Sequence, residues 1–595
     1  MRLLAAALIY VAVSTVAAVI LGENAGGLSW GVSFVSLIAG ASAAVATFFL
    51  MPLPPPRAPV SSTIDDPFWK YRSIWLCLVG FVFAMFALRS FCWILFFAGE
   101  QLNIQSPFNL GDLGLHITYI KTFANGVAMW PESPIYVYSQ LRYPAGIDLF
   151  NGLLTNLGFD LRHQLIATGL FASLATFYAL YRWGGTFTVA GFLFNGGIAG
   201  YQILDTHKFL DYQGTSYVAW KSIPLTMFVT QRGLLYAIPA GLLLLCQWRS
   251  KYGSEEQKQQ QLLPVWAEYI LYASMPLFHV HTFIALSIVL LVLFLTRPAS
   301  RLALLKLVGA AVLPAVFFVW LTTDHMRAGS ILAWHFGWTQ TVGDFKMEFF
   351  LFWLFNFGAF LPLAIALVWI VAQQESTRPR SDKFELSIDA AYLAAASLIF
   401  LLSLCVKTAP WEWDNIKLLI WAYVITLPIL WERMLRRWPV PARAGVCIII
   451  FFSGFVSLIG GLAANKDGYQ FANRSEVDLV ADAVRRLPVE ARFAGFPTYN
   501  HPLLLNGRKM VCGYGGHLWT QGINFTDVES KLQKLMLGQG DWKKAARELQ
   551  VRYLFWGNLE KANYAASTRP WEKQLPLVAQ GGWGSIYDFG SETTL

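Results

Sequence analysis

The chain has 595 residues, of which 56% are hydrophobic and only 14% charged, whereas an average soluble protein carries about 25% charged residues. The formal net charge is +9, but much of the excess stands in short segments between long apolar runs, where Lys and Arg set membrane orientation. The composition therefore excludes an ordinary soluble protein and gives no support for a nucleic-acid partner. The six cysteines show neither a disulfide framework nor metal-binding spacing.

Apolar segments of membrane length recur along the chain, and a spanning helix needs about 20 such residues. The sequence predicts a polytopic α-helical membrane protein with about thirteen spans. We place them at 3–21, 30–51, 73–98, 161–181, 185–203, 226–247, 262–277, 282–297, 302–322, 348–372, 388–406, 416–431 and 442–463. We expect three parts: residues 1–72 with two spans and a Pro-rich linker, a main transmembrane domain at 73–464, and a C-terminal domain at 465–595.

Basic loops predict the orientation of these spans. The linker 52–72 is basic, and so are alternate later loops such as "ERMLRRWPVPAR". Loops rich in Lys and Arg face the cytoplasm, so the loop 99–160 and the C-terminal domain are expected on the extracytoplasmic side. The first span lacks a clear small-residue cleavage site, and we expect a signal anchor, with a cleaved signal peptide as the alternative.

The loop 99–160 is long enough to suggest a function. It contains "GDLGLHITY", which predicts a helix from about Gly111 to Asn125 with Asp112, His116 and Tyr119 on one face. Asp112 is the first candidate for a catalytic residue, and the alternative is an N-cap. His116 is the second candidate, and the alternative is a hydrogen-bonded partner.

Two arginines are candidates for binding phosphate. Arg142 in "LRYPAGID" suits either a phosphate or a backbone carbonyl. Arg232 interrupts the apolar run 226–247, where a charge costs a few kcal/mol. One interpretation is that its guanidinium binds a phosphate through two parallel hydrogen bonds. The alternative is that the side chain snorkels to the outer membrane interface.

Histidines lie where two short spans are expected to meet. His279 and His281 in "MPLFHVHTF" are candidates for hydrogen bonding to phosphate or sugar. A structural role is the alternative. A metal site is weakly indicated, since two imidazoles lack a certain third ligand.

The stretch "VKTAPWEWDNIKLLIWAY" crowds polar and aromatic groups at the outer end of two spans. Lys407 and Lys417 are candidates for neutralising a phosphate, and Trp411 and Trp413 for stacking on a sugar, beside Asp414. The alternatives are a simple i, i+3 ion pair between Asp414 and Lys417 and tryptophans of an interfacial belt.

The tail is expected to form a small α/β domain. Two helices, "SEVDLVADAVRRLP" and "DWKKAARELQ", alternate with the strands "ARFAGFP" and "VRYLFWG". Between them, "TYNHPLLLNGRKMVCGYGGHLWTQGIN" predicts an irregular region that closes over the site, with His501 as a candidate substrate-binding residue. No Walker motif is present, which argues against an ATP-driven transporter.

A polytopic chain with an acid in a long first extracytoplasmic loop and a soluble C-terminal domain resembles the GT-C superfamily of integral-membrane glycosyltransferases. The segments "TQRGLLYAIP", "PLFHVHTF", "PWEWDN" and "TYNHPLLLNGR" are similar to segments of bacterial membrane proteins placed near this group. The resemblance implies a bacterial inner-membrane location and a polyprenyl-phosphate-linked sugar donor. It also implies an inverting reaction onto a glycan, lipid or protein acceptor of the cell envelope.

Within this resemblance the loop acid corresponds to Asp112. Many members place two acids together in this loop, whereas here Leu113 and Gly114 follow Asp112. The resemblance therefore allows a divalent cation, but the sequence offers no acidic pair to hold one, and we name no metal ligand.

Two other classes fit a polytopic chain with polar outer loops. A transporter or lipid flippase would place charges near mid-bilayer and show internal repeats, and no repeat is found. A non-catalytic membrane scaffold would need no polar cluster at the outer face.

Overall fold

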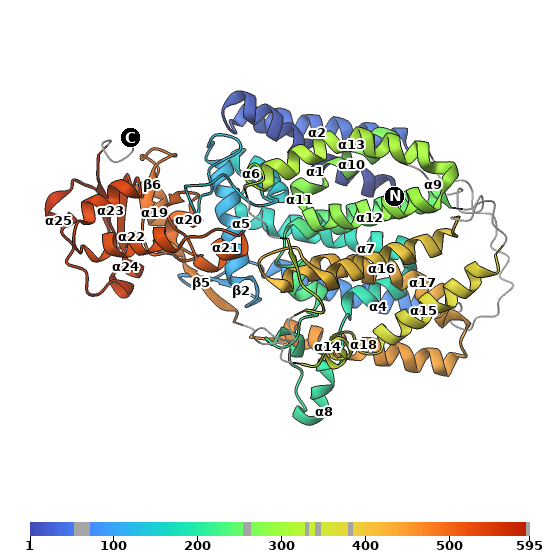
Figure 1. Ribbon diagram of the computed structural model, residues 1–595. Helices are drawn as coiled ribbons and strands as arrows, with labels where there is room; N and C mark the ends of the chain where they lie inside the picture. The colour runs from blue at the N-terminus through green and yellow to red at the C-terminus, as the bar shows by residue number, and fades with distance from the viewer. Residues whose placement is uncertain are drawn as a thin grey trace.

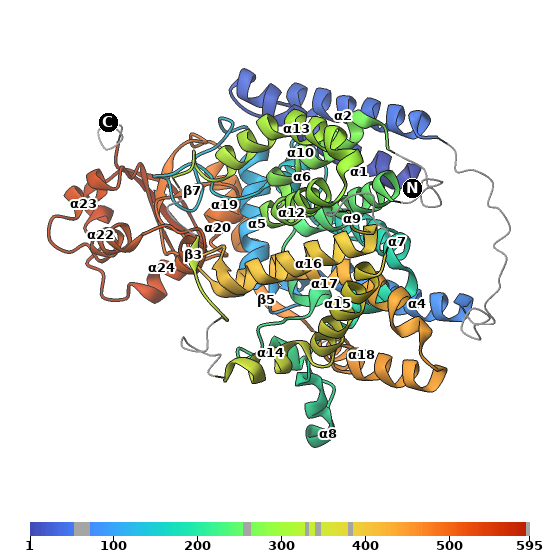
Figure 2. The ribbon, with the colours of Figure 1, turned by 45° about the vertical axis from the view of Figure 1, so that its right-hand side comes forward.

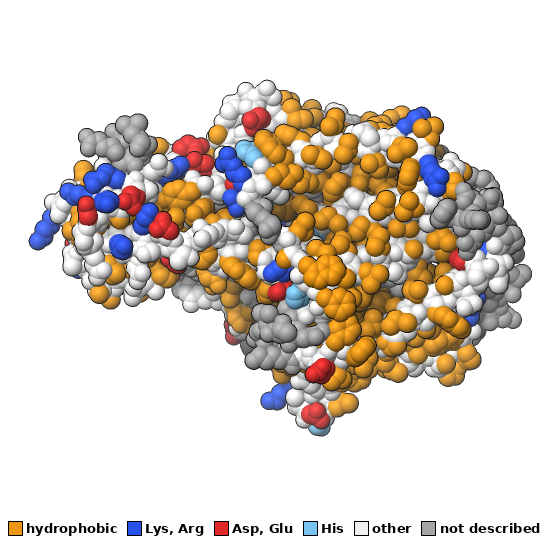
Figure 3. All heavy atoms as spheres, viewed as in Figure 1, with side chains coloured by type: hydrophobic (Ala, Val, Ile, Leu, Met, Phe, Trp, Pro, Cys, Tyr) orange, Lys and Arg blue, Asp and Glu red, His pale blue; other side chains and the backbone are white. Residues whose placement is uncertain are grey.

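The computed structural model describes residues 1–52, 72–253, 263–327, 332–338, 347–378, 385–465 and 467–590. A helical bundle carries the C-terminal domain at one end (Figure 1). The same arrangement is seen in the turned view (Figure 2). Hydrophobic side chains cover the visible face of the bundle, and charged ones gather on the C-terminal domain and at the bundle ends (Figure 3). This distribution is that of a membrane protein with a polar domain outside the bilayer.

Eight helices in the described residues are long and apolar enough to cross a membrane. These eight candidate spans coincide with, or contain most of, α1 (Arg2–Ala25), α2 (Trp30–Leu50), α4 (Arg72–Cys92), α7 (Leu161–Leu193), α13 (Arg301–Thr322), α16 (Ile388–Cys405), α17 (Ile416–Arg433) and α18 (Val440–Ala463). The pair α14 (Phe349–Phe357) and α15 (Phe360–Ser376), bent by 95°, would make a ninth. The predicted polytopic helical class is confirmed, whereas the count of about thirteen is not.

Glycine and proline explain the lower count. The predicted spans 161–181 and 185–203 meet at Gly184 and Gly185, where Gly185 has φ 68° and breaks α7. The predicted spans 226–247, 262–277 and 282–297 are short or divided helices. They form the π-helix η3 (Ile223–Phe228) and α9 (Gly233–Tyr252), then α10 (Val265–Ala273), α11 (Met275–Phe278) and α12 (Val280–Thr296). Pro224 and Pro276 each stand in the first turn of a new helix, where the missing N–H of proline costs no hydrogen bond within the helix.

The loop 99–160 is ordered around two helices. The predicted helix is confirmed as α5 (Asn109–Ala124), and α6 (Gly146–Asn156) was not predicted. Before α5, β1 (Phe96–Ala98) and β2 (Gln101–Ile104) form a hairpin. Strand β2 also pairs antiparallel with β5 (Tyr469–Asn473), which ties the loop to the start of the C-terminal region (Figure 1).

The C-terminal domain is built on a five-stranded sheet of order β7-β6-β8-β10-β9. Its strands are β6 (Arg492–Ala494), β7 (Lys509–Met510), β8 (Tyr553–Gly557), β9 (Leu577–Gly581) and β10 (Gly584–Asp588). Strand β6 runs parallel to β7 and β8, and β10 runs antiparallel to β8 and β9. Its helices are α19 (Arg474–Val484), α20 (Pro502–Leu505), α21 (Gly515–Thr520), α22 (Thr526–Leu537), α23 (Trp542–Glu548), α24 (Asn558–Asn563) and α25 (Trp571–Gln574). The four predicted elements correspond to α19, β6, α23 and β8.

Candidate functional site

Polar side chains from distant parts of the chain meet where the bundle joins the C-terminal domain. We call Asp112, Tyr143, Gln231, Asp414 and Lys417 the Asp112 cluster, because a hydrogen bond, an ion pair or an electrostatic interaction links each of them to another member. They come from α5, the loop before α6, the turn before α9, the 3-10 helix η5 (Glu412–Asn415) and the first turn of α17. Each of the charged members is only partly or slightly exposed, which strengthens their mutual electrostatic interactions.

Asp112 stands in the first turn of α5 and is half-buried. The N-cap of this helix is Phe108, without a side-chain cap, so the N-cap interpretation of Asp112 is wrong. Gln231 Nε2 donates to Asp112 Oδ2 at 3.4 Å. Burial raises the pKa of the Asp112 carboxyl; His116 and Lys417 lower it in part, and Asp414 adds to the rise. Asp112 is thus a carboxylate whose affinity for a proton is increased.

His116 belongs to a buried network behind Asp112. Its Nδ1 lies 2.8 Å from Asp148 Oδ2, and its Nε2 lies 3.2 Å from the carbonyl oxygen of Thr230. Both ring nitrogens thus face oxygen atoms of the protein. His116 therefore has no free ring nitrogen to take a proton from a substrate.

Arg232 completes this network. Its Nε lies 3.5 Å from Asp148 Oδ1, and its Nη2 donates to Asn151 Oδ1 at 2.7 Å. The side chain is 1% exposed, so it does not extend to the membrane interface as the snorkelling alternative requires. The guanidinium is held by groups of the protein, away from any surface where a phosphate would arrive.

Asp148 was missed in the sequence. It is fully buried in the first turn of α6, and it is the carboxylate that neutralises both His116 and Arg232. Its sequence signal is a lone acid immediately before the apolar segment "LFNGLL". Buried charges require such partners, so an unpaired His and Arg in apolar surroundings were themselves a reason to look for an acid.

The start of α17 brings the second acid and the cation of the Asp112 cluster together. Lys417 Nζ lies 2.8 Å from Asp414 Oδ1, as the i, i+3 alternative predicted. Nearby, the rings of Trp411 and Trp413 are stacked with centroids 4.9 Å apart. Trp411 is 42% exposed and therefore presents an apolar ring at this end of the bundle.

Lys407 lies beside these tryptophans but turns toward its own loop. Its Nζ donates to the carbonyl oxygen of Pro410 at 3.1 Å and lies 3.7 Å from Glu412. Lys407 thus shares its charge with the Glu412 carboxylate, as Lys417 does with that of Asp414.

The two histidines lie next to each other at the start of α12, with ring centroids 5.6 Å apart. His279 caps the helix: its Nδ1 accepts from the Thr282 N–H at 3.1 Å. Its Nε2 is buried with no hydrogen-bond partner among the described residues. His281 Nε2 lies 3.2 Å from Thr408 Oγ1. The ammonium of Lys417 acts on both rings, which places them beside the Asp112 cluster.

Two predicted residues lie apart from the cluster. Arg142 donates two hydrogen bonds to one oxygen of Asp324: its Nε and Nη2 lie 3.1 and 2.9 Å from Oδ2. His501 is fully buried inside the C-terminal domain, where Nε2 lies 3.0 Å from Glu560 Oε1 and Nδ1 accepts from the Leu503 N–H. Arg142 thus links the loop 99–160 to the end of α13, and His501 stabilises the C-terminal domain.

A metal ion has no evident set of ligands. In the parts of the chain that the structure describes, no three His, Cys, Asp or Glu side chains form a group that could hold one. Asp414 is already paired with Lys417, so the steps proposed below use the side chains alone.

Residues of the C-terminal domain cover α5. Gln521 Nε2 donates to the Tyr119 hydroxyl at 3.0 Å, and a methyl group added to Gly111 would lie 3.3 Å from His517 Nε2. Burial, and to a lesser degree His116, lowers the pKa of His517 to about 4, so this ring is neutral at pH 7. Trp519 lies with its ring centroid 6.5 Å from that of Trp411. All three covering side chains belong to the segment that was predicted to close over the site, although that segment contains α20, β7 and α21 and is not wholly irregular.

Replacing Gly114 with Ala should loosen this contact, because the added methyl group would meet the Tyr499 carbonyl oxygen at 2.5 Å. Such overpacking costs about 1–3 kcal/mol. We expect faster limited proteolysis at the junction between α5 and the C-terminal domain. Gly309→Ala is the matched control, since nothing lies within 4 Å of the added group. Equal proteolysis of the two variants would contradict the tight docking of this domain.

Comparisons with known proteins give structural similarities only. No protein-family model matches the chain, and no curated protein matches it. The chain is similar to the apo form of the Archaeoglobus fulgidus oligosaccharyltransferase, with a TM-score of 0.46 and 12% identity over 82% of this chain and 70% of that chain. It is also similar to arabinofuranosyltransferase AftD from Mycobacteria, with a TM-score of 0.40 and 12% identity over 87% of this chain and 40% of that chain. Because these similarities are low, the function proposed below depends on the arrangement of side chains.

Proposed function

We propose that this protein is a membrane glycosyltransferase that moves a sugar from a polyprenyl phosphate carrier to a cell-envelope acceptor. The observation that carries the proposal is the Asp112 cluster itself: a half-buried carboxylate of raised pKa, acted on by the Lys417 ammonium, at the bundle end that also presents Trp411. This transfer needs a general base, a cation that stabilises the leaving phosphate, and an aromatic ring that stacks on the sugar.

The proposed reaction is a single displacement with inversion. The acceptor hydroxyl oxygen forms a bond to the anomeric carbon while the bond from that carbon to the carrier phosphate oxygen breaks. The phosphate leaves with the electron pair, and the hydroxyl proton passes to Asp112. Gln231 occupies Oδ2 of this carboxylate, which leaves Oδ1 for the proton. A raised pKa favours this transfer, because a stronger base takes a proton more readily.

Lys417 would stabilise the charge that develops on the leaving phosphate, and Asp414 fixes its position through their ion pair. His279 and His281 lie within the electrostatic reach of Lys417, and we assign them to hydrogen bonding with the phosphate or sugar. The buried unpaired Nε2 of His279 supports this role.

His116, Asp148 and Arg232 act as positioning residues in this account. His116 bonds the carbonyl of Thr230, and the next residue, Gln231, bonds Asp112. The network therefore orients the Asp112 carboxylate through the consecutive residues Thr230 and Gln231. Fixing a reacting group in this way contributes to rate by reducing its freedom.

A transporter or flippase is the second candidate, and one observation favours it. Glu268 and Asp389 are buried near the end of the bundle opposite the Asp112 cluster, so buried ionisable groups are not confined to the cluster's end. These acids are paired with basic residues of the helix ends, Lys251, Arg249 and Arg433, at 2.9, 3.0 and 2.6 Å. Such pairs fix helix ends, which accounts for them without transport.

Loss of the gene product followed by mass analysis of envelope lipids and glycans tests the proposed function. We expect a polyprenyl-phosphate-linked sugar to accumulate and one glycosylated product to disappear. Unchanged profiles in both fractions would contradict the proposal.

The pH dependence of transfer tests the electrostatic effect of Lys417 on Asp112. The base must be deprotonated to act, so kcat/KM falls as the pH drops through its raised pKa. Since Lys417 lowers that pKa, Lys417→Met should move the acidic limb to higher pH by up to about 1 unit. Lys407→Met removes the same charge at the same bundle end and should leave the limb in place. If the acidic limb of Lys417→Met does not move, or moves to lower pH, Lys417 does not lower the pKa of Asp112 as proposed.

A further inference from the structure

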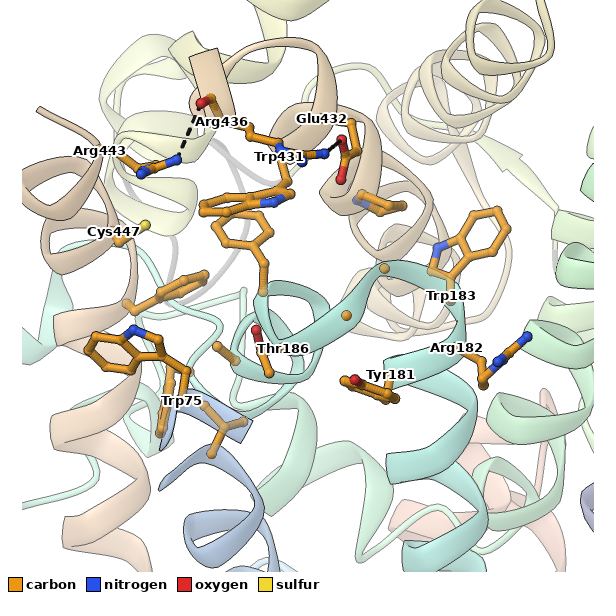
Figure 4. Close-up of a pocket in the computed structure, with 18 of the residues that line it drawn as sticks. Trp75, Tyr181, Arg182, Trp183, Thr186, Trp431, Glu432, Arg436, Arg443 and Cys447 are labelled. Atoms are coloured by element: carbon orange, nitrogen blue, oxygen red, sulfur yellow. Dashed lines mark hydrogen bonds and ion pairs between the residues drawn. The ribbon is translucent and has the colours of Figure 1, made fainter. Parts of the chain in front are cut away.

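A second polar region lies at the opposite end of the bundle. A pocket of about 950 Å³ is bordered by α4, α7, α9, α17 and α18 (Figure 4). Helix α17 links the two regions, with Lys417 in its first turn and the pocket residue Glu432 near its end. At 1.5 Å per residue these positions are separated by about 22 Å, so the pocket is separate from the Asp112 cluster.

The pocket is lined by four arginines and one acid: Arg182, Arg249, Arg436, Arg443 and Glu432. Arg436 pairs with Glu432 at 2.8 Å, and Arg249 pairs with Asp389 outside the lining at 3.0 Å. Within the described lining, four guanidinium groups thus accompany one carboxylate, that of Glu432. Arginine is well suited to bind phosphate, because its planar fork makes two parallel hydrogen bonds.

Arg443 is the buried arginine of the basic wall. Its side chain is 3% exposed and donates from Nη1 to the Arg436 carbonyl at 3.2 Å. Its guanidinium lies 5.6 Å from the centroid of the Trp431 ring. Figure 4 shows Arg443, Arg436 and Trp431 together along one wall, with Trp75 on the opposite side. The cationic groups are thus held in place before any ligand arrives.

Most of the remaining lining residues are apolar, and the apolar lining continues to the outside of the bundle. Ile448 and Phe455 of α18 line the pocket and are 64% and 37% exposed. A ligand in this pocket can therefore have a tail that leaves sideways along α18. A basic pocket between membrane helices whose apolar wall continues to the lipid-facing surface fits an amphiphile with an anionic head.

We propose that this pocket binds one anionic phospholipid, with the phosphate on the arginine wall and the acyl chains along Phe451, Phe455 and Ile448. The pocket also contains Gly184 and Gly185, where α7 is broken. A bound lipid would fill the space beside this break and stabilise the adjoining helix ends. The site is independent of glycosyl transfer, and its occupancy is measured without an enzymatic assay.

Native mass spectrometry of the full-length protein in mild detergent tests the proposal. The probes are phosphatidylglycerol and phosphatidylcholine with identical acyl chains, and inorganic phosphate alone. We expect phosphatidylglycerol to bind about tenfold more tightly than phosphatidylcholine, which corresponds to about 1.4 kcal/mol. Equal retention of the two lipids, or displacement of phosphatidylglycerol by equimolar inorganic phosphate, would overturn the proposal.

Two variants separate the headgroup contact from folding. Arg436→Gln combined with Arg443→Gln should remove the preference for phosphatidylglycerol. Arg437→Gln is the matched control, because Arg437 is exposed in the same 3-10 helix η6 (Leu435–Arg437) but does not line the pocket. Ala444→Trp adds bulk to the lining without changing charge, and it should displace both lipids by at least about tenfold. Full lipid retention in Ala444→Trp, or equal loss in Arg437→Gln and the double variant, would contradict the site.

Discussion

Asp112→Asn is expected to slow glycosyl transfer by about 10²–10⁴-fold, the usual contribution of a general base. The amide keeps the size of the side chain and its contact with Gln231, but it does not take the acceptor proton. Because Asp112 is half-buried and makes one long hydrogen bond, the free energy of unfolding should change little. The measurement is the initial rate of transfer by purified protein at matched concentrations.

Asp160→Asn provides the control for this loss. Asp160 is 61% exposed and caps α7 through the His163 N–H, and asparagine caps a helix equally well. Its rate should match that of the unsubstituted protein. Full activity of Asp112→Asn would remove Asp112 from the reaction.

Asp148→Asn is expected to destabilise the protein by about 3–5 kcal/mol, the cost of breaking a buried ion pair by removing one partner. Asp148 is fully buried and faces both His116 at 2.8 Å and Arg232 at 3.5 Å. Neutralising it leaves the buried Arg232 guanidinium with no carboxylate and removes the carboxylate that His116 Nδ1 contacts. The measurement is the midpoint of denaturant unfolding in detergent, together with the transfer rate of the folded fraction.

A double-mutant cycle separates the pair from its surroundings. Asp148→Asn combined with Arg232→Met should be less destabilised than the sum of the single variants, because the unpaired charge is removed. Glu132→Gln is the matched control: its carboxylate pairs with Arg492 and Lys509 but is 32% exposed, so its loss should cost less than about 1 kcal/mol. Additive effects of Asp148 and Arg232 would contradict a functional network between them.

The sequence predicted best where periodicity and chemistry agree. Helix α5 was predicted because Asp112, His116 and Tyr119 share a helical spacing, and the amphipathic α19 by the same reasoning. The divided spans were harder, because mean hydropathy does not show where a helix breaks. Gly185 becomes a break only through its positive φ, and η3 only through its bonding pattern.

Tertiary contacts explain what sequence reasoning missed at the site. Asp148 pairs with His116, 32 residues earlier, and Arg232 lies 84 residues after it in the chain; no local pattern links the three. Arg142 and His501 have the chemistry of binding residues, but Asp324 and Glu560 occupy them. The two-residue strand β7 at the sheet edge is too short to give a periodic signal.

The most direct test of the central claim is mass analysis of a polyprenyl-phosphate-linked sugar pool incubated with purified protein in proteoliposomes and an envelope-derived acceptor fraction. The account predicts that one donor species is consumed, that free polyprenyl phosphate appears in equal amount, and that an acceptor gains the mass of that sugar. A donor pool that stays intact, or a donor that crosses the bilayer without losing its sugar, would contradict it.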